Sequence, residues 1–359
     1  MPKQAKILFI LPYPIGFAPS QRFRVEAFFP LLQEHGFQIH NSCFFSEADW
    51  EVLYKKGSLG QKTWAVTRGF ASRLALLAGK VWCYDYIFIH REASPLGPPF
   101  VEWFLAKVGR KKFIYDFDDA IWIPNTSKEN RIVGWIKAFW KVRYNCSWAY
   151  KVVGGNEYLI DYARRYNNNV VSIPTCVDVE ARHNKLKDSV TGKLTIGWTG
   201  SHSTLHYLDE VIPVIKRLQD EFDFDFIVIA NQAPVLPLKN WTFIPWQEKT
   251  EIEDLLKLDI GIMPLKPDTW SEGKCGFKLI QYLALGIPAV ASTVGVNSKI
   301  INQGQNGFLC TTTDEWYLAL RRLLQDINLR NDLGIRGRKK IVEEYSIQSQ
   351  EQTFLKLFS

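Results

Sequence analysis

The chain has 359 residues, of which 47% are hydrophobic and 23% charged, and this composition excludes a disordered or collagen-like protein. At one domain per roughly 150 residues, the length suggests about two domains. Residues 1–180 contain 23 Lys and Arg against 16 Asp and Glu, whereas residues 181–359 contain 21 of each, so the first half carries the whole net charge of +7. Such a one-sided basic domain suggests an anionic partner: a membrane surface, a phosphorylated substrate or a nucleic acid.

No run of 18 apolar residues is present, because Gln281, Gly286 and Pro288 interrupt the longest candidate, so we expect no membrane-spanning helix. The first apolar run ends in Pro-Tyr-Pro without a small-residue cleavage site and indicates a buried strand rather than a signal peptide. The six cysteines form no CxxC pair, which favours a reducing, cytoplasmic location without a zinc site or disulfide framework.

In the first half, short apolar runs alternate with polar loops and amphipathic segments. We predict strands over 6–11, 86–90, 112–115, 152–154 and 170–173, and a helix from about Arg22 to His35. The segment 174–189 loses this periodicity and becomes polar, which marks a junction.

The second half repeats the alternation. We predict strands over 194–198, 224–229, 242–244, 260–263, 289–292 and 308–310, and helices over 204–221, 252–258, 277–285 and 314–326. The expected fold class is α/β, with two Rossmann-like doubly wound domains over 1–178 and 190–345 and a short amphipathic helix within 346–359. Ligands bind at the carboxyl ends of such strands, so we expect a central cleft lined by loops from both domains.

The most informative motif is SEGKCGFKLIQYLALGIPAVAS at residues 271–292. A glycine-bearing loop opens a helix at about Phe277, and the N–H groups of a first helical turn can seat a diphosphate. Lys274 and Lys278 would add positive charge, and Gln281, one turn further, could hydrogen-bond a ribose diol. The alternative is an ordinary glycine-rich connection to a core helix with lysines on its solvated face.

A second turn, GWTGSHSTL at 197–205, directly follows a predicted strand. Gly200 permits close backbone approach, and Ser201, Ser203 and Thr204 can cap the following helix. Such turns bind phosphate, but an ordinary helix cap has the same pattern.

Two polar clusters end strands of the first half. The carboxylates of Asp116, Asp118 and Asp119 could hold a divalent cation, accept sugar hydroxyls or act as a base, or could instead form ion pairs with Arg91. His90 ends the preceding strand, where it either contacts a ligand or has a structural role.

The segment 131–151 contains five basic residues and no acid. Its apolar side chains follow a helical period, which suggests an interfacial helix at a membrane or, alternatively, a helix packed into its own domain. Nucleic acid is a lesser interpretation, because no recognition motif accompanies the charge. The candidate acceptor or membrane residues are Arg131, Trp135, Lys137, Phe139, Trp140, Lys141 and Arg143.

No nucleophile elbow, Walker A loop, HExxH motif or dinucleotide fingerprint is present, which argues against ATP hydrolysis, zinc proteolysis and hydride transfer. The segments that carry a resemblance to a known family are KILFILPYPIG at 6–16, VVGGNEYLIDYARRYNNNVVSIPTCVD at 152–178, the motif from Gly273, and GQNGFLC at 304–310. Through them, nearly the whole chain resembles retaining GT-B glycosyltransferases of family 4. It departs from the family signature at Gln281 and Gly273, where glutamates are usual, with Glu272 one residue earlier. Ser201-His202-Ser203 also stands where the family has an Arg and a Lys.

The resemblance implies an acceptor-binding first domain, a nucleotide-sugar-binding second domain, a last helix that crosses back to the first domain, and no metal or other cofactor. The expected reaction transfers a sugar, with retained configuration, from a nucleoside-diphosphate sugar to a glycan or lipid-linked hydroxyl in cell-surface polysaccharide or glycoconjugate synthesis. The protein would then work in the cytoplasm or peripherally at the inner membrane face. The alternatives are a sugar-nucleotide epimerase of the same fold and a non-catalytic sugar-nucleotide binding protein.

Four residues are catalytic candidates: His90, Asp118, Asp119 and Lys274. The donor-binding candidates are Gly16, Gly200, Ser201, His202, Glu272, Lys274, Gly276, Phe277, Lys278 and Gln281.

Overall fold

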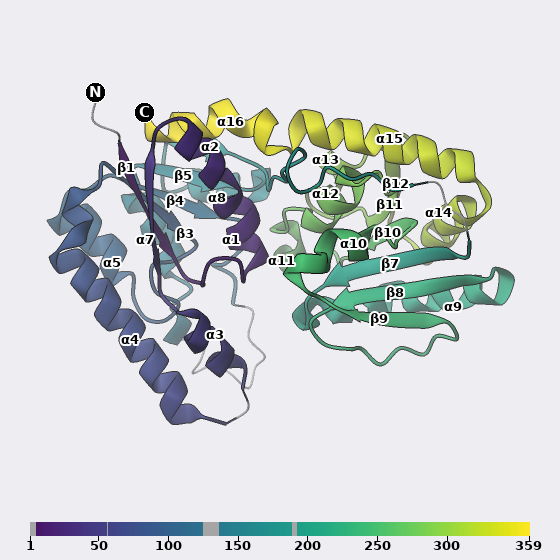
Figure 1. Cartoon of the computed structure of the whole chain (residues 1–359), viewed down its shortest axis with the longest axis horizontal. Helices are drawn as coiled ribbons and strands as arrows, with labels where there is room; N and C mark the ends of the chain where they lie inside the picture. Colours follow the sequence, from purple (N-terminus) through teal and green to yellow (C-terminus); the bar gives the residue numbers. More distant parts are fainter. Residues whose placement is uncertain (1–4, 56, 125–135, 189–191) are drawn as a thin grey trace. The chain divides into compact units, whose positions relative to one another are not determined.

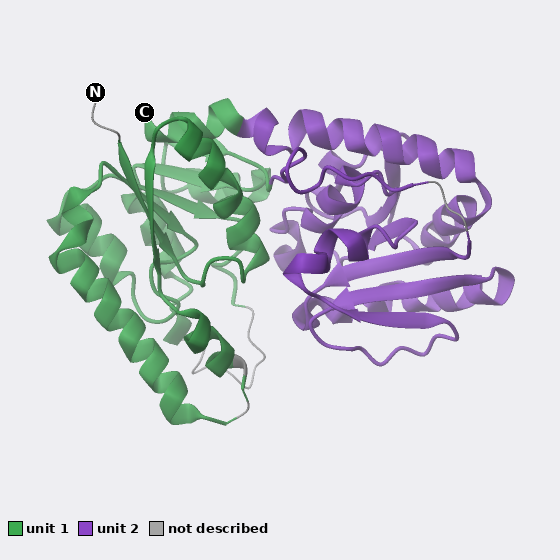
Figure 2. Cartoon of the chain, in the orientation of Figure 1, with its two compact units in different colours: residues 1–175, 351–359 green, residues 176–350 purple. Residues whose placement is uncertain are grey.

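The computed structural model describes residues 5–55, 57–124, 136–188 and 192–359, and the chain divides into two compact units (Figure 2). Unit 1 contains residues 1–175 and 351–359, and unit 2 contains residues 176–350. The last residues of the chain therefore belong to the same unit as the first. Within the described ranges, no helix is long and apolar enough to cross a lipid bilayer.

Unit 1 is built on a parallel six-stranded sheet in the order β2-β1-β3-β4-β5-β6 (Figure 1). Its strands are β1 Lys6–Leu11, β2 Gln38–Cys43, β3 Tyr86–His90, β4 Phe113–Phe117, β5 Lys151–Gly154 and β6 Val170–Ser172. The inner strands β1, β3 and β4 are nearly continuous buried runs, as expected where both faces of a parallel sheet are covered. The edge strand β2 is polar and partly exposed, and no apolar run predicted it.

Helices and helical turns connect these strands. They are α1 Pro19–Arg24, η1 Glu26–Phe28, α2 Phe29–Glu34, α3 Glu47–Tyr54, α4 Leu59–Ala78, η2 Lys80–Cys83, α5 Phe100–Trp103, η3 Phe104–Val108, α7 Lys141–Trp148 and α8 Glu157–Arg164. The predicted single helix over 22–35 is wrong, because Val25 leaves helical geometry and Pro30, which lacks an N–H donor, helps to start a separate α2.

Unit 2 has a second parallel sheet, in the order β12-β11-β10-β7-β8-β9. Its strands are β7 Leu194–Gly200, β8 Phe224–Ala230, β9 Trp241–Pro245, β10 Ile260–Met263, β11 Ala289–Ser292 and β12 Gly307–Cys310. Both sheets are wound in two directions from an inner strand, so the predicted fold class of two doubly wound α/β domains is confirmed.

The helices of unit 2 include one pair that the sequence predicted as a single element. They are η5 His202–Glu210, α9 Ile212–Glu221, η6 Glu248–Thr250, α10 Glu251–Leu255, α11 Thr269–Glu272, α12 Phe277–Ala284, α13 Asn297–Ile300, α14 Thr313–Gln325 and α15 Ile327–Glu344. The predicted helix over 204–221 is instead a 3₁₀ helix followed by α9, which begins afresh with Pro213 in its first turn.

The C-terminal segment consists of α16 Ile347–Leu355 and η7 Lys356–Phe358. The ring of Phe354 stacks on Phe28 with centroids 3.9 Å apart, and Lys151 donates hydrogen bonds to the carbonyl oxygens of Lys356 and Leu357. These contacts attach the end of the chain to unit 1 through both apolar packing and hydrogen bonds.

Candidate functional site

In unit 2 the strand order reverses between β7 and β10, and ligands of such sheets bind in the crevice at this position. The two strands pair only at Ile196 and Gly197, so they part toward their carboxyl ends. The hydroxyl of Tyr282 lies in the split, where it accepts a hydrogen bond from the Thr199 N–H at 2.9 Å and donates to the Ile262 carbonyl at 3.4 Å. Burial raises the pKa of Tyr282, so this hydroxyl stays protonated and can donate.

Helix α12 begins beside this split. Gly276 is its N-cap residue with φ +68°, and a Cβ there would lie 2.1 Å from Cδ1 of Ile300, so only glycine fits without rearrangement. The helix dipole places partial positive charge at this end, which suits a diphosphate.

Three predicted donor residues lie close to this helix end: Lys274 in the loop before α12, and Lys278 and Gln281 on α12 itself. The Lys278 ammonium lies 5.4 Å from the ring centroid of Trp198 on β7, and the Lys274 ammonium lies 5.1 Å from that of Trp270. Gln281 is only 2% exposed, and its Nε2 has no hydrogen-bond partner among the described residues. An unsatisfied buried amide costs about 1–3 kcal/mol, and a bound hydroxyl acceptor would remove that cost.

The turn after β7 supplies the neighbouring backbone. A Cβ on Gly200 would lie 2.3 Å from the Trp198 ring, so the chain turns tightly against that indole. The His202 N–H donates to Asn231 Oδ1 at 2.8 Å, and the Asn231 amide lies 3.0 Å from His202 Nδ1. The predicted cap by Ser201 is wrong, because its hydroxyl pairs with Ser203 at 2.8 Å and makes no cap bond.

Glu272 ends the short helix α11 and is partly exposed. This helix is held by Tyr207, whose hydroxyl lies 3.1 Å from that of Ser271, and by Asp268, whose carboxylate accepts the Ser271 N–H at 2.7 Å. The backbone of Gly295 packs closely on Glu272, since a Cβ there would be 3.2 Å from the Glu272 Cα. The loop before α12 is therefore constrained on two sides.

In unit 1 the strand order reverses between β1 and β3. Near this position three buried polar side chains contact one another: His90 at the end of β3, Asp116 on β4 and Arg24 on α1. His90 Nδ1 is 2.7 Å from Asp116 Oδ2, and Asp116 also forms an ion pair with Arg24. Burial opposes ionisation of Asp116, but Arg24 and His90 outweigh it and lower the pKa of the carboxyl. Since a carboxylate only accepts, His90 donates from Nδ1, and its Nε2 faces the Ser20 hydroxyl at 3.4 Å.

Asp118 and Asp119, the other catalytic candidates of this half, both accept hydrogen bonds from Arg91, Asp118 at 2.7 Å. Burial acts to raise the pKa of Asp118, but the charge of Arg91 outweighs it and lowers that pKa. Ion pairing, one of the alternatives that the sequence left open, is therefore present, and a catalytic role for either carboxylate stays a prediction.

The loop after β1 is held by two side chains that the sequence interpretation missed. The N–H of Gly16, at φ +86°, donates to Glu26 Oε2 at 2.9 Å, and the Gln21 amide donates to Glu26 Oε1 at 2.7 Å and to the Tyr13 carbonyl at 3.1 Å. Nothing in the sequence distinguished these polar residues from solvent-exposed ones. Contact between Gly16 and a donor stays a prediction.

The predicted interfacial helix over 131–151 is wrong as a single element. Arg131 and Trp135 lie outside the described residues, and Ala138, at φ +51°, interrupts the helical geometry before α7 begins. Lys141 is not a surface residue: it is 3% exposed, and its ammonium lies 2.7 Å from Glu92 and 2.8 Å from the Ser94 carbonyl oxygen. Of the remaining candidates, Phe139 is half-buried and Lys137, Trp140 and Arg143 are exposed.

The comparison with protein families matches residues 193–326 to the family described as Glycosyl transferases group 1. The matched residues all lie within unit 2. A curated relative, N-acetyl-alpha-D-glucosaminyl L-malate synthase of Bacillus anthracis, is 31% identical over 83 residues. That match spans 22% of this chain and 22% of the relative.

Solved structures similar to the whole chain share its fold at low sequence identity. Sucrose-phosphate synthase from Thermosynechococcus elongatus matches with a TM-score of 0.70 and 12% identity, covering 99% of this chain and 98% of the other. A glycosyltransferase from Rickettsia africae matches with a TM-score of 0.68, 12% identity and the same coverage. HepE of Anabaena, solved in complex with UDP and glucose, matches with a TM-score of 0.66 and 16% identity over 99% of both chains. The predicted GT-B fold is thereby confirmed.

Unit 2 contains all the donor candidates from Gly200 to Gln281, and Lys278 of α12 approaches Trp198 of β7 at the switch point of its sheet. Gly16, His90, Asp118 and Asp119 belong to unit 1, at the carboxyl ends of β1, β3 and β4.

Proposed function

We propose that the protein is a retaining glycosyltransferase. In this proposal unit 2 holds the diphosphate of a nucleoside-diphosphate sugar at the start of α12. The observation that carries the proposal is the combination of a glycine N-cap, two lysines and the buried Gln281, whose Nε2 has no hydrogen-bond partner in the described part of the chain, beside the β7–β10 split. The helix end and the lysines stabilise the charge that develops on the leaving diphosphate, and Gln281 binds the ribose hydroxyls.

In the proposed reaction the bond between the anomeric carbon and the diphosphate oxygen breaks, and the acceptor oxygen forms the new bond on the same face of the sugar. The acceptor hydroxyl proton passes to the leaving diphosphate oxygen, so no enzymic nucleophile is required. His90, whose ring Asp116 holds by Nδ1, orients a sugar or acceptor hydroxyl through Nε2, with the substrate taking the place of the Ser20 hydroxyl. The reaction needs no metal or other cofactor.

The acceptor in this proposal is a hydroxyl of a glycan or a lipid-linked intermediate in cell-surface polysaccharide or glycoconjugate synthesis, used on the cytoplasmic face of the membrane. The support for an anionic or membrane-bound partner is the charge excess of seven in the first 180 residues.

The test is donor turnover by Lys274→Ala and Lys278→Ala. Each substitution should lower kcat by roughly 10²-fold, because it removes one charge from the leaving diphosphate. The matched control is Lys249→Ala, an exposed lysine on η6, which should retain wild-type kcat. Wild-type-like kcat in both α12-region variants would remove these lysines from the proposed role.

Two further outcomes separate the alternative functions. Formation of an epimer from nucleotide sugar without any acceptor identifies an epimerase. Tight nucleotide binding without turnover of any acceptor identifies a non-catalytic binding protein, in keeping with Gly273 and Gln281 at the positions where the family has glutamates.

A further inference from the structure

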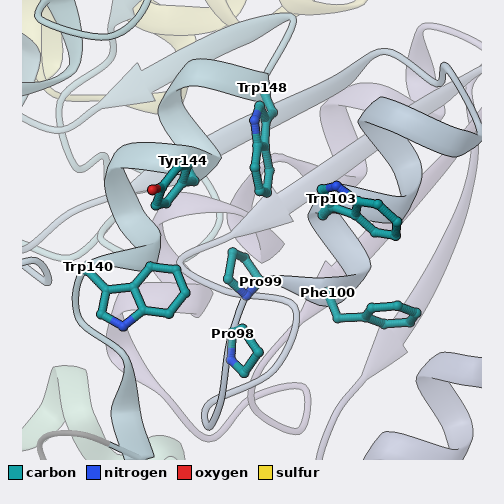
Figure 3. Close-up of a pocket in the computed structure, with 7 residues that line it drawn as sticks. All are labelled: Pro98, Pro99, Phe100, Trp103, Trp140, Tyr144 and Trp148. Carbon is teal, nitrogen blue, oxygen red and sulfur yellow. The ribbon is translucent and has the colours of Figure 1, made fainter.

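A cluster of aromatic side chains on unit 1 forms an open pocket of about 270 Å³ that the proposed chemistry does not use. Figure 3 shows the rings of α5, of α7 and of Trp140 just before α7 arranged around Pro98 and Pro99. We call this pocket the aromatic cup. Its lining residues are Pro98, Pro99, Phe100, Trp103, Trp140, Tyr144 and Trp148.

The cup exposes large apolar side chains to solvent. Phe100 is 45% exposed, Trp103 40% and Trp140 47%. The apolar surface continues past the cup, since Phe104 lies 6.1 Å from Phe100 and 6.4 Å from Trp82, which is itself 42% exposed. A contiguous exposed patch of this kind marks an interaction site.

Polar bonds beneath the rings hold α5 and α7 in place. The buried carboxylate of Glu102 on α5 accepts hydrogen bonds from Asn145 of α7 at 3.3 Å and from the Ala93 N–H at 3.0 Å. Lys141 of α7 donates to the Ser94 carbonyl at 2.8 Å. Because its backbone is anchored in this way, the cup does not close over its own rings, and their exposed surface is open to a partner.

The cup has cationic surroundings. Within the described segments 92–116 and 136–151, the acidic residues are Glu92, Glu102 and Asp116. Glu92 is paired with Lys141, and Glu102 and Asp116 are buried. The exposed basic residues of the same segments are Lys107, Arg110, Lys112, Lys137 and Arg143. The surface around the rings therefore complements an anionic, apolar partner.

We propose that the aromatic cup seats unit 1 on an anionic lipid bilayer. Phe100, Trp103 and Trp140 enter the boundary between headgroups and acyl chains, where indole rings are favoured, and the surrounding cations bind lipid phosphates. The surface differs from the helix over 131–151 that the sequence predicted, because the segment 98–103 supplies four of its seven lining residues and Lys141 is buried beneath it. The proposal extends the membrane-linked acceptor proposed above, but vesicle binding is measured without donor or acceptor, so either proposal can fail alone.

The experiment is co-sedimentation of the full chain with vesicles of phosphatidylcholine alone or mixed with phosphatidylglycerol. We expect stronger binding to the anionic vesicles. The double variant Trp103→Ala with Trp140→Ala should lower the vesicle partition coefficient at least about tenfold, because both rings leave the interface. The double variant Lys107→Gln with Arg110→Gln should lower the vesicle partition coefficient by roughly five-fold for each cation removed, because each cation binds anionic lipid.

Matched controls separate the cup from general surface effects. Trp64→Ala removes an exposed tryptophan from the first half of α4, and Lys249→Gln with Lys299→Gln removes two exposed cations from unit 2. Both should bind vesicles like the wild type. Circular dichroism and the thermal midpoint confirm that each variant is folded.

Three results would overturn the proposal. They are no binding of the wild type to anionic vesicles, equal binding to neutral and anionic vesicles, or unchanged binding after loss of both tryptophans. Sedimentation velocity without lipid tests another occupant: a dimer that the two tryptophan substitutions dissociate would assign the cup to a second copy of the chain instead.

Discussion

Glu102 shows how one buried group links stability to pH. The carboxyl is 1% exposed, and burial raises its pKa although backbone hydrogen bonds and Lys141 oppose that shift. A carboxyl whose pKa is higher in the folded state than in the unfolded chain stabilises the fold below the unfolded pKa of about 4.3. That contribution is lost as the pH rises through the folded pKa.

The variant Glu102→Gln keeps the oxygen that accepts from Asn145 and Ala93 and removes the ionisation. We expect its free energy of unfolding to exceed that of the wild type near pH 7, with the advantage shrinking toward about pH 4. Urea unfolding at several pH values measures this difference. Glu157→Gln, at an exposed glutamate of α8, is the control and should show no such trend. An advantage that is equal at every pH contradicts the assigned titration.

At the scale of an element, the C-terminal segment is part of the core of unit 1. Phe354 is 1% exposed, stacks on Phe28 and lies 6.1 Å from Phe88 of β3. Substitution of a buried Phe by Ala costs about 3–5 kcal/mol through lost burial and the resulting cavity. Phe354→Ala should therefore lower the free energy of unfolding of unit 1 by that amount.

The protection of the amides of β1 and β3 against hydrogen exchange, measured together with urea unfolding, reports on the stability of unit 1, because both strands belong to its sheet. Gln352→Ala, an exposed position on the same helix, is the control and should change stability by less than about 0.5 kcal/mol. Unchanged protection of β1 in Phe354→Ala would mean that unit 1 does not depend on this segment.

At the scale of the whole molecule, the proposed function predicts that one unit responds to nucleotide. A ligand that binds only folded unit 2 stabilises that unit by about 2.7 kcal/mol at a hundred times Kd. In a thermal-shift screen of UDP, GDP, ADP and their sugars, one base should raise the unfolding midpoint, and Gln281→Ala should reduce the shift. An equal rise with all bases, or none, argues against nucleotide binding at α12.

The strands show which parts of the fold local sequence can predict. β1, β3, β10 and β11 have the predicted bounds, because strands buried on both faces are continuous apolar runs that end at polar residues or before proline. The edge strand β2 has no such run, because its pairing with β1 depends on backbone hydrogen bonds more than on side-chain burial. The helices over 22–35 and 204–221 were predicted unbroken because hydrophobic periodicity does not register the geometry of Val25 or Val211.

The candidate site divides in the same way. Gly276, Lys278 and Gln281 were recognisable from a contiguous motif, and the structure places that motif at a switch point of the sheet. Gln21 and Glu26, which hold the loop after β1, carry no local signal, since their partners are each other and backbone groups of a loop eight to ten residues away.

By itself, the sequence determined the α/β class, the number of doubly wound domains and the helix that begins at Gly276, because burial periodicity and glycine positions are local properties of the chain. Only the tertiary structure decided which charges are paired and which aromatic rings are exposed. Lys141 is buried and paired with Glu92, and Arg91 forms ion pairs with both Asp118 and Asp119. Trp103 and Trp140 meet in one cup because α5 and α7 pack together, and such contacts between distant segments leave no mark on local periodicity.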